Sequence, residues 1–275
     1  MIKFSGFRFQ VSEFSFQVSE FSFRFSGFRF RLFSYSIIQL LFFSACDRED
    51  AWDIFKTRGD SAVEYLTFPA FNGITVDNGI NVVLANGDTY AATVNGWKNL
   101  MPKIKFSVDE EGKLLIEDKN SFNFVRTRDN RTTVYLTFAG ELNFMELNGD
   151  GSIISNDTVF TSGLTVLCID ASGSVDLTVK TQGLYIGTNH NNVASVTVGG
   201  LANYVGITNW GYNPVNLFDL VSFYADIHQH GTGNTYINAS ESLSVVLYGF
   251  GNVYYKGNPS ITLNRMGNGN LFGAD

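Results

Sequence analysis

Cysteine, proline and charged residues are scarce in this chain. Of 275 residues, 2 are Cys and 4 are Pro, and Asp, Glu, Lys and Arg together make up 16%. So few cysteines exclude a small disulfide-stapled fold, and so little charge excludes a disordered tail or a coiled coil. Basic residues are the minority among the charged ones, and the formal net charge is −7. A nucleic acid is therefore not an expected partner.

Apolar and aromatic residues are plentiful but unevenly distributed. They make up 44% and 15% of the chain, which is long enough to bury a core. Of the 26 Phe, 13 fall in residues 1–45, a segment with 5 Lys or Arg and 2 Glu. The rest holds 14 basic and 24 acidic side chains, a formal balance of −10. This change of composition near residue 46 separates a leader from the mature chain.

The leader begins with short repeats. The sequence QVSEFSF occupies residues 10–16 and again 17–23, and FSGFRF occupies residues 4–9 and 25–30. Repeat folds need units of about 20 residues or more. We therefore interpret residues 1–28 as the translation of tandem DNA upstream of the true start, with a genuine long leader as the alternative.

The end of the leader has the features of a secretory signal. Arg29 and Arg31 precede a short apolar run, 32–43, which is followed by the small residues Ser44 and Ala45. The next residue is Cys46, and residues 43–46 resemble the lipobox of bacterial lipoproteins, in which this cysteine carries lipid. The alternative is an ordinary signal peptide with an incidental cysteine.

An acidic stretch follows Cys46. A basic residue and two acids here resemble the surface-export signal of Bacteroidetes lipoproteins, in the segment Asp47, Arg48, Glu49 and Asp50. Residues 46–64 are thus expected to be a lipidated tether to an outer membrane, with the protein displayed on the cell surface. The alternatives are a solvated linker and the periplasmic face of the membrane.

Residues 65–275 are predicted to form one all-β domain. Apolar and polar residues alternate in short runs separated by Asn-Gly turns, as half-buried strands require. Over 148–271, glycine- or asparagine-rich turns recur at a nearly constant interval, in 149–151, 172–173, 191–192, 211–213, 231–233, 249–251 and 267–269. Turn-plus-strand units at this spacing predict a β-helix-like solenoid with coils of about 20 residues. An antiparallel sandwich is the alternative.

Residues 65–147 are less regular and would form broader first coils or an antiparallel cap.

The order of these motifs resembles a known family. It includes Ile74, the run 78–84, Pro102, the Gly-x-Gly turns and the run 251–259. Together they are similar to the putative autotransporter-adhesin family with a head GIN domain, a domain of unknown function in Bacteroidetes lipoproteins. The resemblance covers about residues 53–271. It implies a right-handed β-solenoid in the cell envelope and supplies no catalytic residues.

Aromatic side chains in the turns are the candidate ligand-binding groups. Exposed rings can stack on sugars or anchor a protein surface, and asparagine amides nearby can supply hydrogen bonds. The candidates are Trp210, Tyr212, Asn189, Asn191, Tyr248 and Phe250. The alternative interpretation is an aromatic ladder that covers the coil edges.

Other motifs favour ordinary structural roles. Asp226, His228 and His230 share strand spacing, which suits a metal, but an exposed polar strand opposite buried Val221, Phe223, Ala225 and Ile227 is the simpler interpretation. Cys168 is expected to be a buried, inert thiol. We predict no metal, cofactor or catalytic residues.

The predicted function is a lipid-anchored, non-catalytic binding or adhesion module for a glycan or a surface protein. The alternatives are a structural or sensing lipoprotein that faces the periplasm and a carbohydrate-active enzyme. The carboxylates that would serve such an enzyme do not share a motif that sets their separation.

Overall fold

The computed structural model describes residues 58–120 and 131–274. A 3₁₀ turn, η1 (Met101–Lys103), interrupts a series of strands. The strands are β1 (Ser61–Thr67), β2 (Gly73–Asp77), β3 (Asn81–Asn86), β4 (Ala91–Trp97), β5 (Ile104–Val108), β6 (Lys113–Asp118), β7 (Thr133–Phe138), β8 (Phe144–Asn148), β9 (Ser152–Ser155), β10 (Val159–Ile169), β11 (Ser174–Thr188), β12 (Ser195–Asn209), β13 (Val215–Gln229), β14 (Thr235–Leu247), β15 (Val253–Lys256), β16 (Ser260–Arg265) and β17 (Leu271–Gly273). Within the described ranges, no helix is long and apolar enough to cross a membrane.

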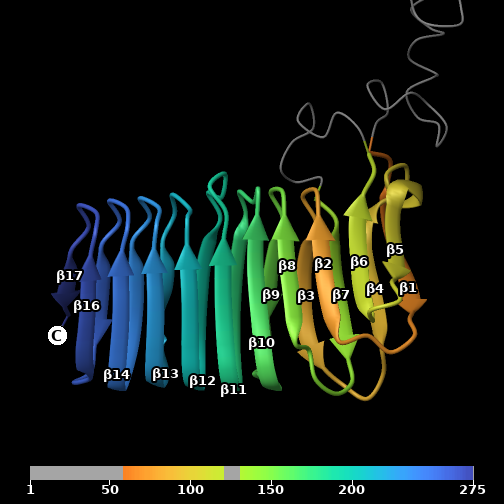
Figure 1. Cartoon of the computed structure of the whole chain (residues 1–275). Coiled ribbons are helices and arrows are strands. Elements are labelled where there is room, and N and C mark those ends of the chain that lie inside the picture. Colours follow the sequence, from red (N-terminus) through yellow and green to blue (C-terminus); the bar gives the residue numbers. More distant parts are fainter. Residues whose placement is uncertain (1–57, 121–130, 275) are drawn as a thin grey trace, which may run out of the picture. The chain divides into compact units, whose positions relative to one another are not determined.

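Strands β8 to β17 wind into a β-solenoid (Figure 1). Each long strand bends in the middle, so its first part pairs in one sheet, sheet A, and its second part in the other, sheet B. In sheet B, Leu164 pairs with Leu184 of the next coil, and Leu184 pairs with Val205 of the coil after that. These register pairs confirm the predicted solenoid and its coil length of about 20 residues. The last coils are slightly shorter, as the pairing of Leu243 with Ile261 shows.

The N-terminal part departs from simple chain order. Strand β2 pairs in parallel with both β6 and β8, and β3 pairs with both β7 and β9. The coil formed by β2 and β3 is thus inserted between later strands. Three strand pairs beyond it are antiparallel, namely β1 with β4, β4 with β7, and β5 with β6. These pairs form the antiparallel cap that was one of the two expectations for this part. The first strand begins at Ser61, ahead of the expected domain start at residue 65.

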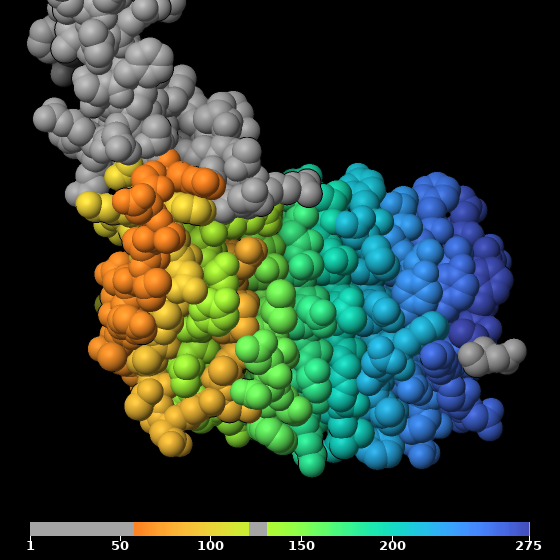
Figure 2. Space-filling model, turned by 180° about the vertical axis from the view of Figure 1, so that it is seen from behind, coloured from red at the N-terminus to blue at the C-terminus, as the bar shows by residue number. Residues whose placement is uncertain are grey.

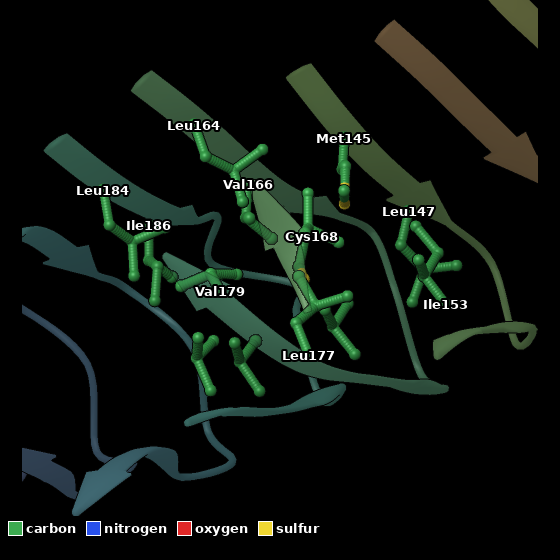
Figure 3. Packing of buried hydrophobic residues seen from close by; sticks show 14 of the residues in the cluster. Met145, Leu147, Ile153, Leu164, Val166, Cys168, Leu177, Val179, Leu184 and Ile186 are labelled. Carbon is green, nitrogen blue, oxygen red and sulfur yellow. The ribbon is translucent and has the colours of Figure 1, made fainter. Parts of the chain in front are cut away.

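The core lies between the two sheets. Alternate residues of both sheets point inward, and Figure 3 shows side chains such as Val166, Leu177 and Ile186 meeting there. Each coil covers only a narrow strip of this core, so burial depends on the coils stacked on either side. Figure 2 shows the later coils, from green to blue, side by side in chain order on the reverse face. Cys168 points into the same core as a free thiol, as expected, and burial raises its pKa to about 12.

Glycines let the turns of neighbouring coils stack closely. A Cβ on Gly231 would overlap the carbonyl oxygen of Gly211 in the preceding coil. Neither residue has a positive φ. Glycine at these two positions therefore reflects close backbone approach between coils, rather than the left-handed turn conformation that glycine often supplies.

Candidate functional site: an aromatic turn edge

Four aromatic rings from successive turns stack along one edge of the solenoid. We call His190, Trp210, His230 and Tyr248 the ring stack. The ring centroids of His190 and Trp210 are 4.4 Å apart, those of Trp210 and His230 are 3.8 Å apart, and those of His230 and Tyr248 are 4.2 Å apart. The last two pairs are nearly parallel, with interplanar angles of 12° and 5°. The spacing follows from the separation of adjacent strands, about 4.8 Å.

The stack covers both faces of the Trp210 indole. His190 lies against one face and His230 against the other, so the edge of the indole is what solvent reaches. The structure thus brings two of the expected ligand-binding rings, Trp210 and Tyr248, into one ladder. Both side chains remain partly exposed. Their stacked faces contact His230, and these contacts stabilise the turns.

A buried polar ladder beneath the stack holds the turns. Thr188, Asn209 and Gln229 are in register in three successive coils, and Thr235 follows the turn after Gln229. All four side chains are buried. The Thr188 hydroxyl donates to Asn209 Oδ1 at 2.9 Å, and Thr235 donates to Gln229 Oε1 at 2.7 Å. The backbone N–H of Trp210 donates to Thr188 Oγ1 at 3.0 Å. Buried polar groups that are paired in this way fix a unique geometry, and here that geometry places the indole.

Two expected asparagines serve the first turn of this edge. Asn189 Nδ2 and Asn191 Nδ2 both donate to Asp170 Oδ1, at 2.7 and 2.8 Å. These bonds lower the pKa of the Asp170 carboxyl, with Asn189 the larger cause. Asp170 has a φ of 51°, in the left-handed region that Asp tolerates better than most residues. The two amides therefore bind within the protein and stabilise this strained turn.

Tyr212 and Phe250 are the most accessible of the expected rings. Their side chains are 60% and 68% exposed, and each lies two residues after a member of the ring stack. Tyr212 is anchored by its backbone N–H, which donates to the carbonyl oxygen of Asn192 at 3.0 Å. Large exposed rings on a rigid backbone can contact a ligand with little loss of conformational entropy.

The ring stack disfavours positive charge at its centre. Partial burial is the first cause that lowers the pKa of His230, and repulsion from His228 and His190 adds to it. A neutral imidazole also stacks without bringing a charge beside Trp210. His230 is therefore expected to be neutral near neutral pH.

The strand that carries Asp226 and His228 only partly matches the expectation. Asp226 and His228 point outward on sheet B, and Ala225 and Ile227 point into the core, as predicted. The prediction that Val221 and Phe223 are buried is wrong, because both are exposed. The strand bends from one sheet to the other around Ser222, and the inward alternation changes phase at that bend.

The histidines do not assemble a metal site in the described part of the chain. No group of three His, Cys, Asp or Glu side chains there could hold a metal ion. His228 Nε2 lies 3.6 Å from Asp226 Oδ2, while His230 turns toward the ring stack. Cys46 and the acidic stretch 47–50 lie outside the described residues.

Two parts of this surface were missed in the sequence. His190 and His230 lie one coil before and one coil after Trp210, so aligning the turns would have grouped them. A tyrosine row on sheet B, Tyr185, Tyr204 and Tyr224, was also missed. Its signal is the repeated pattern Tyr-x-Gly at 185–187 and 204–206.

Comparison with known proteins identifies the family. The family model described as "Putative auto-transporter adhesin, head GIN domain" matches residues 70–259, more than half of the chain. This match confirms the resemblance seen in the sequence. No curated protein matches the chain.

Solved structures share the fold at low sequence identity. A putative adhesin from Bacteroides fragilis is 21% identical, with a TM-score of 0.70, over 78% of this chain and 97% of that one. A putative adhesin from Parabacteroides merdae is 18% identical, with a TM-score of 0.56, over 79% and 97%. A putative lipid binding protein from Parabacteroides distasonis is 17% identical, with a TM-score of 0.61, over 79% and 98%. At these identities, the matches establish the fold.

Proposed function

The chain belongs to this adhesin family with a head GIN domain, and we propose that it is a non-catalytic binding module of the cell envelope. The proposal has two parts. Lipid on Cys46 anchors the chain to the outer membrane, and the acidic stretch 47–50 directs it to the cell surface. The turn edge then presents its aromatic side chains to a glycan or to a surface protein.

The observation that carries the proposal is the rigid display of exposed rings at the turn edge. Tyr212 and Phe250 project from turns whose backbone is held by the ring stack and the buried polar ladder. A binding protein gains affinity when its contact residues are ordered before the ligand arrives. Tyrosine and other aromatic side chains often contribute most of the energy at such surfaces.

Retention on immobilised polysaccharides and on immobilised cell-surface protein tests the binding part. Tyr212→Ala and Phe250→Ala remove exposed rings and should weaken retention about tenfold while the melting temperature stays near that of the native protein. Tyr135→Ala, an exposed tyrosine on β7, is the matched control. Unchanged retention in both variants would contradict the proposal that the turn edge binds the ligand.

Protease digestion of intact cells tests the anchor and the location. The native protein should be digested. Cys46→Ser should abolish membrane attachment, and a variant with Asp47, Glu49 and Asp50 changed to Ala should be protected from the protease. Protection of the native protein would instead favour a structural or sensing role inside the envelope.

A further inference from the structure

We infer that the outer surface of sheet B carries a second, flat binding platform for a neutral glycan, formed by Tyr185 and Tyr204 with Tyr224 beside them. This inference deepens the proposed function, because it names a ligand class and a surface distinct from the turn edge. It follows from the way the tyrosine rings lie on two glycines.

The rings of Tyr185 and Tyr204 lie flat along their strands. In each strand, the residue two positions on, Gly187 or Gly206, faces the same side of the sheet. A Cβ placed on Gly187 would lie 3.2 Å from Cε1 of Tyr185. A Cβ placed on Gly206 would lie 3.3 Å from Cδ2 of Tyr185 and 3.4 Å from Cε1 of Tyr204.

The burial of the glycines supports the same geometry. Gly187 and Gly206 occupy outward-facing positions, yet both are buried. The tyrosine rings over the two glycines account for this, together with the Leu167 side chain, whose Cδ2 would lie 2.9 Å from a Cβ on Gly187. Tyr185 and Tyr204 nevertheless remain 42% and 47% exposed, so the sides of the rings away from the glycines face solvent.

The platform extends across successive coils. Tyr204 pairs in register with Tyr224, which is 51% exposed, and Tyr185 pairs with Gly206. Adjacent coils are about 4.8 Å apart. Neighbouring rings therefore offer an extended apolar track, which suits a chain of linked sugars better than one small molecule.

The groups around the rings favour a sugar over an apolar partner. Thr165 pairs in register with Tyr185, and Ser244 pairs with Asp226 beside the row. Sugar rings present C–H bonds on their flat faces and hydroxyls at their edges. The C–H bonds can lie on the electron-rich faces of the tyrosines, while the hydroxyls reach Thr165, Ser244 and the Asp226 carboxylate.

The charge on this surface favours a neutral glycan over an anionic one. Asp226 is close enough to Tyr204 to raise the pKa of its phenol, after the larger effect of partial burial. A carboxylate at the rim accepts hydrogen bonds from sugar hydroxyls and repels an acidic polymer. The formal net charge of −7 acts in the same direction.

Affinity electrophoresis of the full chain through gels containing a neutral polysaccharide tests the platform. The panel consists of hydroxyethyl cellulose, glucomannan and mannan, with anionic alginate for comparison. At least one neutral polymer should retard the native protein, and alginate should not. Tyr185→Ala and Tyr204→Ala should each weaken retardation about tenfold, as loss of a central aromatic contact does.

Gly206→Ala provides a sharper variant because it keeps both tyrosines. The added Cβ would lie 3.3 Å from Cδ2 of Tyr185 and 3.4 Å from Cε1 of Tyr204, so the Tyr185 ring must shift by a few tenths of an ångström. Retardation should therefore weaken while folding is preserved. Tyr135→Ala is the control on another strand and should behave like the native protein. Circular dichroism melting of every variant separates loss of binding from loss of the fold.

The outcomes separate this inference from the proposed function. Retardation that is lost in Tyr212→Ala but unchanged in Tyr185→Ala and Tyr204→Ala would overturn the platform and leave the turn edge standing. No retardation by any neutral polymer would overturn the platform, even if the protein binds a surface protein. Self-association that sedimentation equilibrium detects and Tyr204→Ala abolishes would also overturn it, because the row would then be an interface between copies.

Discussion

The indole of Trp210 lies almost parallel to the imidazole of His230, with ring centroids 3.8 Å apart. His230 in turn stacks on Tyr248 at 4.2 Å. Each ring comes from a different coil, so these contacts join turns that backbone hydrogen bonds and the buried polar ladder also connect. The stack therefore belongs to the structure of the edge as well as to its surface.

Trp210→Ala is expected to destabilise the protein, in contrast to Tyr212→Ala. The first change removes ring contacts on both faces of the indole and should reduce the free energy of unfolding by about 2 kcal/mol. The melting temperature should fall by about 4–8 °C for a domain of this size. Tyr212→Ala removes an exposed ring and should stay within about 0.5 kcal/mol of the native protein. Differential scanning calorimetry measures both, and equal melting temperatures would contradict a structural role for the stack.

Stability should fall as the pH drops through the range in which histidine titrates. Burial and the neighbouring His228 and His190 lower the pKa of His230 in the folded protein below its ordinary value of 6.5. Between the lowered pKa and that value, the unfolded chain binds more protons than the folded chain. The contribution of neutral His230 to stability is therefore full above pH 6.5, the ordinary pKa of histidine. It is lost as the pH falls through the lower pKa that His230 has in the folded protein.

His230→Phe isolates this effect, because phenylalanine keeps a flat ring in the stack and does not titrate. Thermal melts at about pH 7.5 and about pH 5 should show a smaller loss of melting temperature in the variant than in the native protein. An equal loss in both proteins would assign the pH dependence to groups outside the ring stack.

Cys168 should be chemically inert while the protein is folded. Burial raises its pKa to about 12, so almost no thiolate exists near neutral pH, and the core excludes reagents. In the full chain with Cys46→Ser, this thiol is the one left to react. Ellman's reagent should label it only after denaturant is added. Rapid labelling of the folded protein would show that the coil around β10 opens readily.

The solenoid could be predicted from sequence because each coil is formed by a short segment of the chain and the same residue pattern repeats from coil to coil. Each coil places a turn, an inward strand and a bend at the same positions, so one regular spacing is visible throughout 148–271. The insertion of β2 and β3 between later strands could not be predicted in this way. That arrangement depends on pairing between strands far apart in the chain, such as β2 with β8, and no local pattern encodes it.

The site was predictable where a residue type marks a turn and was missed where the neighbouring coil decides its environment. Trp210 and Tyr248 are expected at turns, and the structure places them there. When the alternation of inward and outward residues is extended past Gln229, where β13 ends, it places His230 on a strand face. His230 instead belongs to the turn and stacks on Trp210. Phe223 is expected in the core for a related reason, since alternation carried through a bend places it there.

Glycine offers the clearest test of how the coils stack. A Cβ on Gly231 would overlap the backbone of Gly211 and Trp210, whereas a Cβ on Gly183 would have no heavy atom within 4 Å. Gly231→Ala should therefore force the coils apart and destabilise the protein by about 3 kcal/mol. Gly183→Ala should be neutral or stabilise by about 0.5 kcal/mol, because alanine restricts the unfolded chain. Urea unfolding curves measure both changes, and similar midpoints for the two variants would contradict the close backbone approach that sets the repeat.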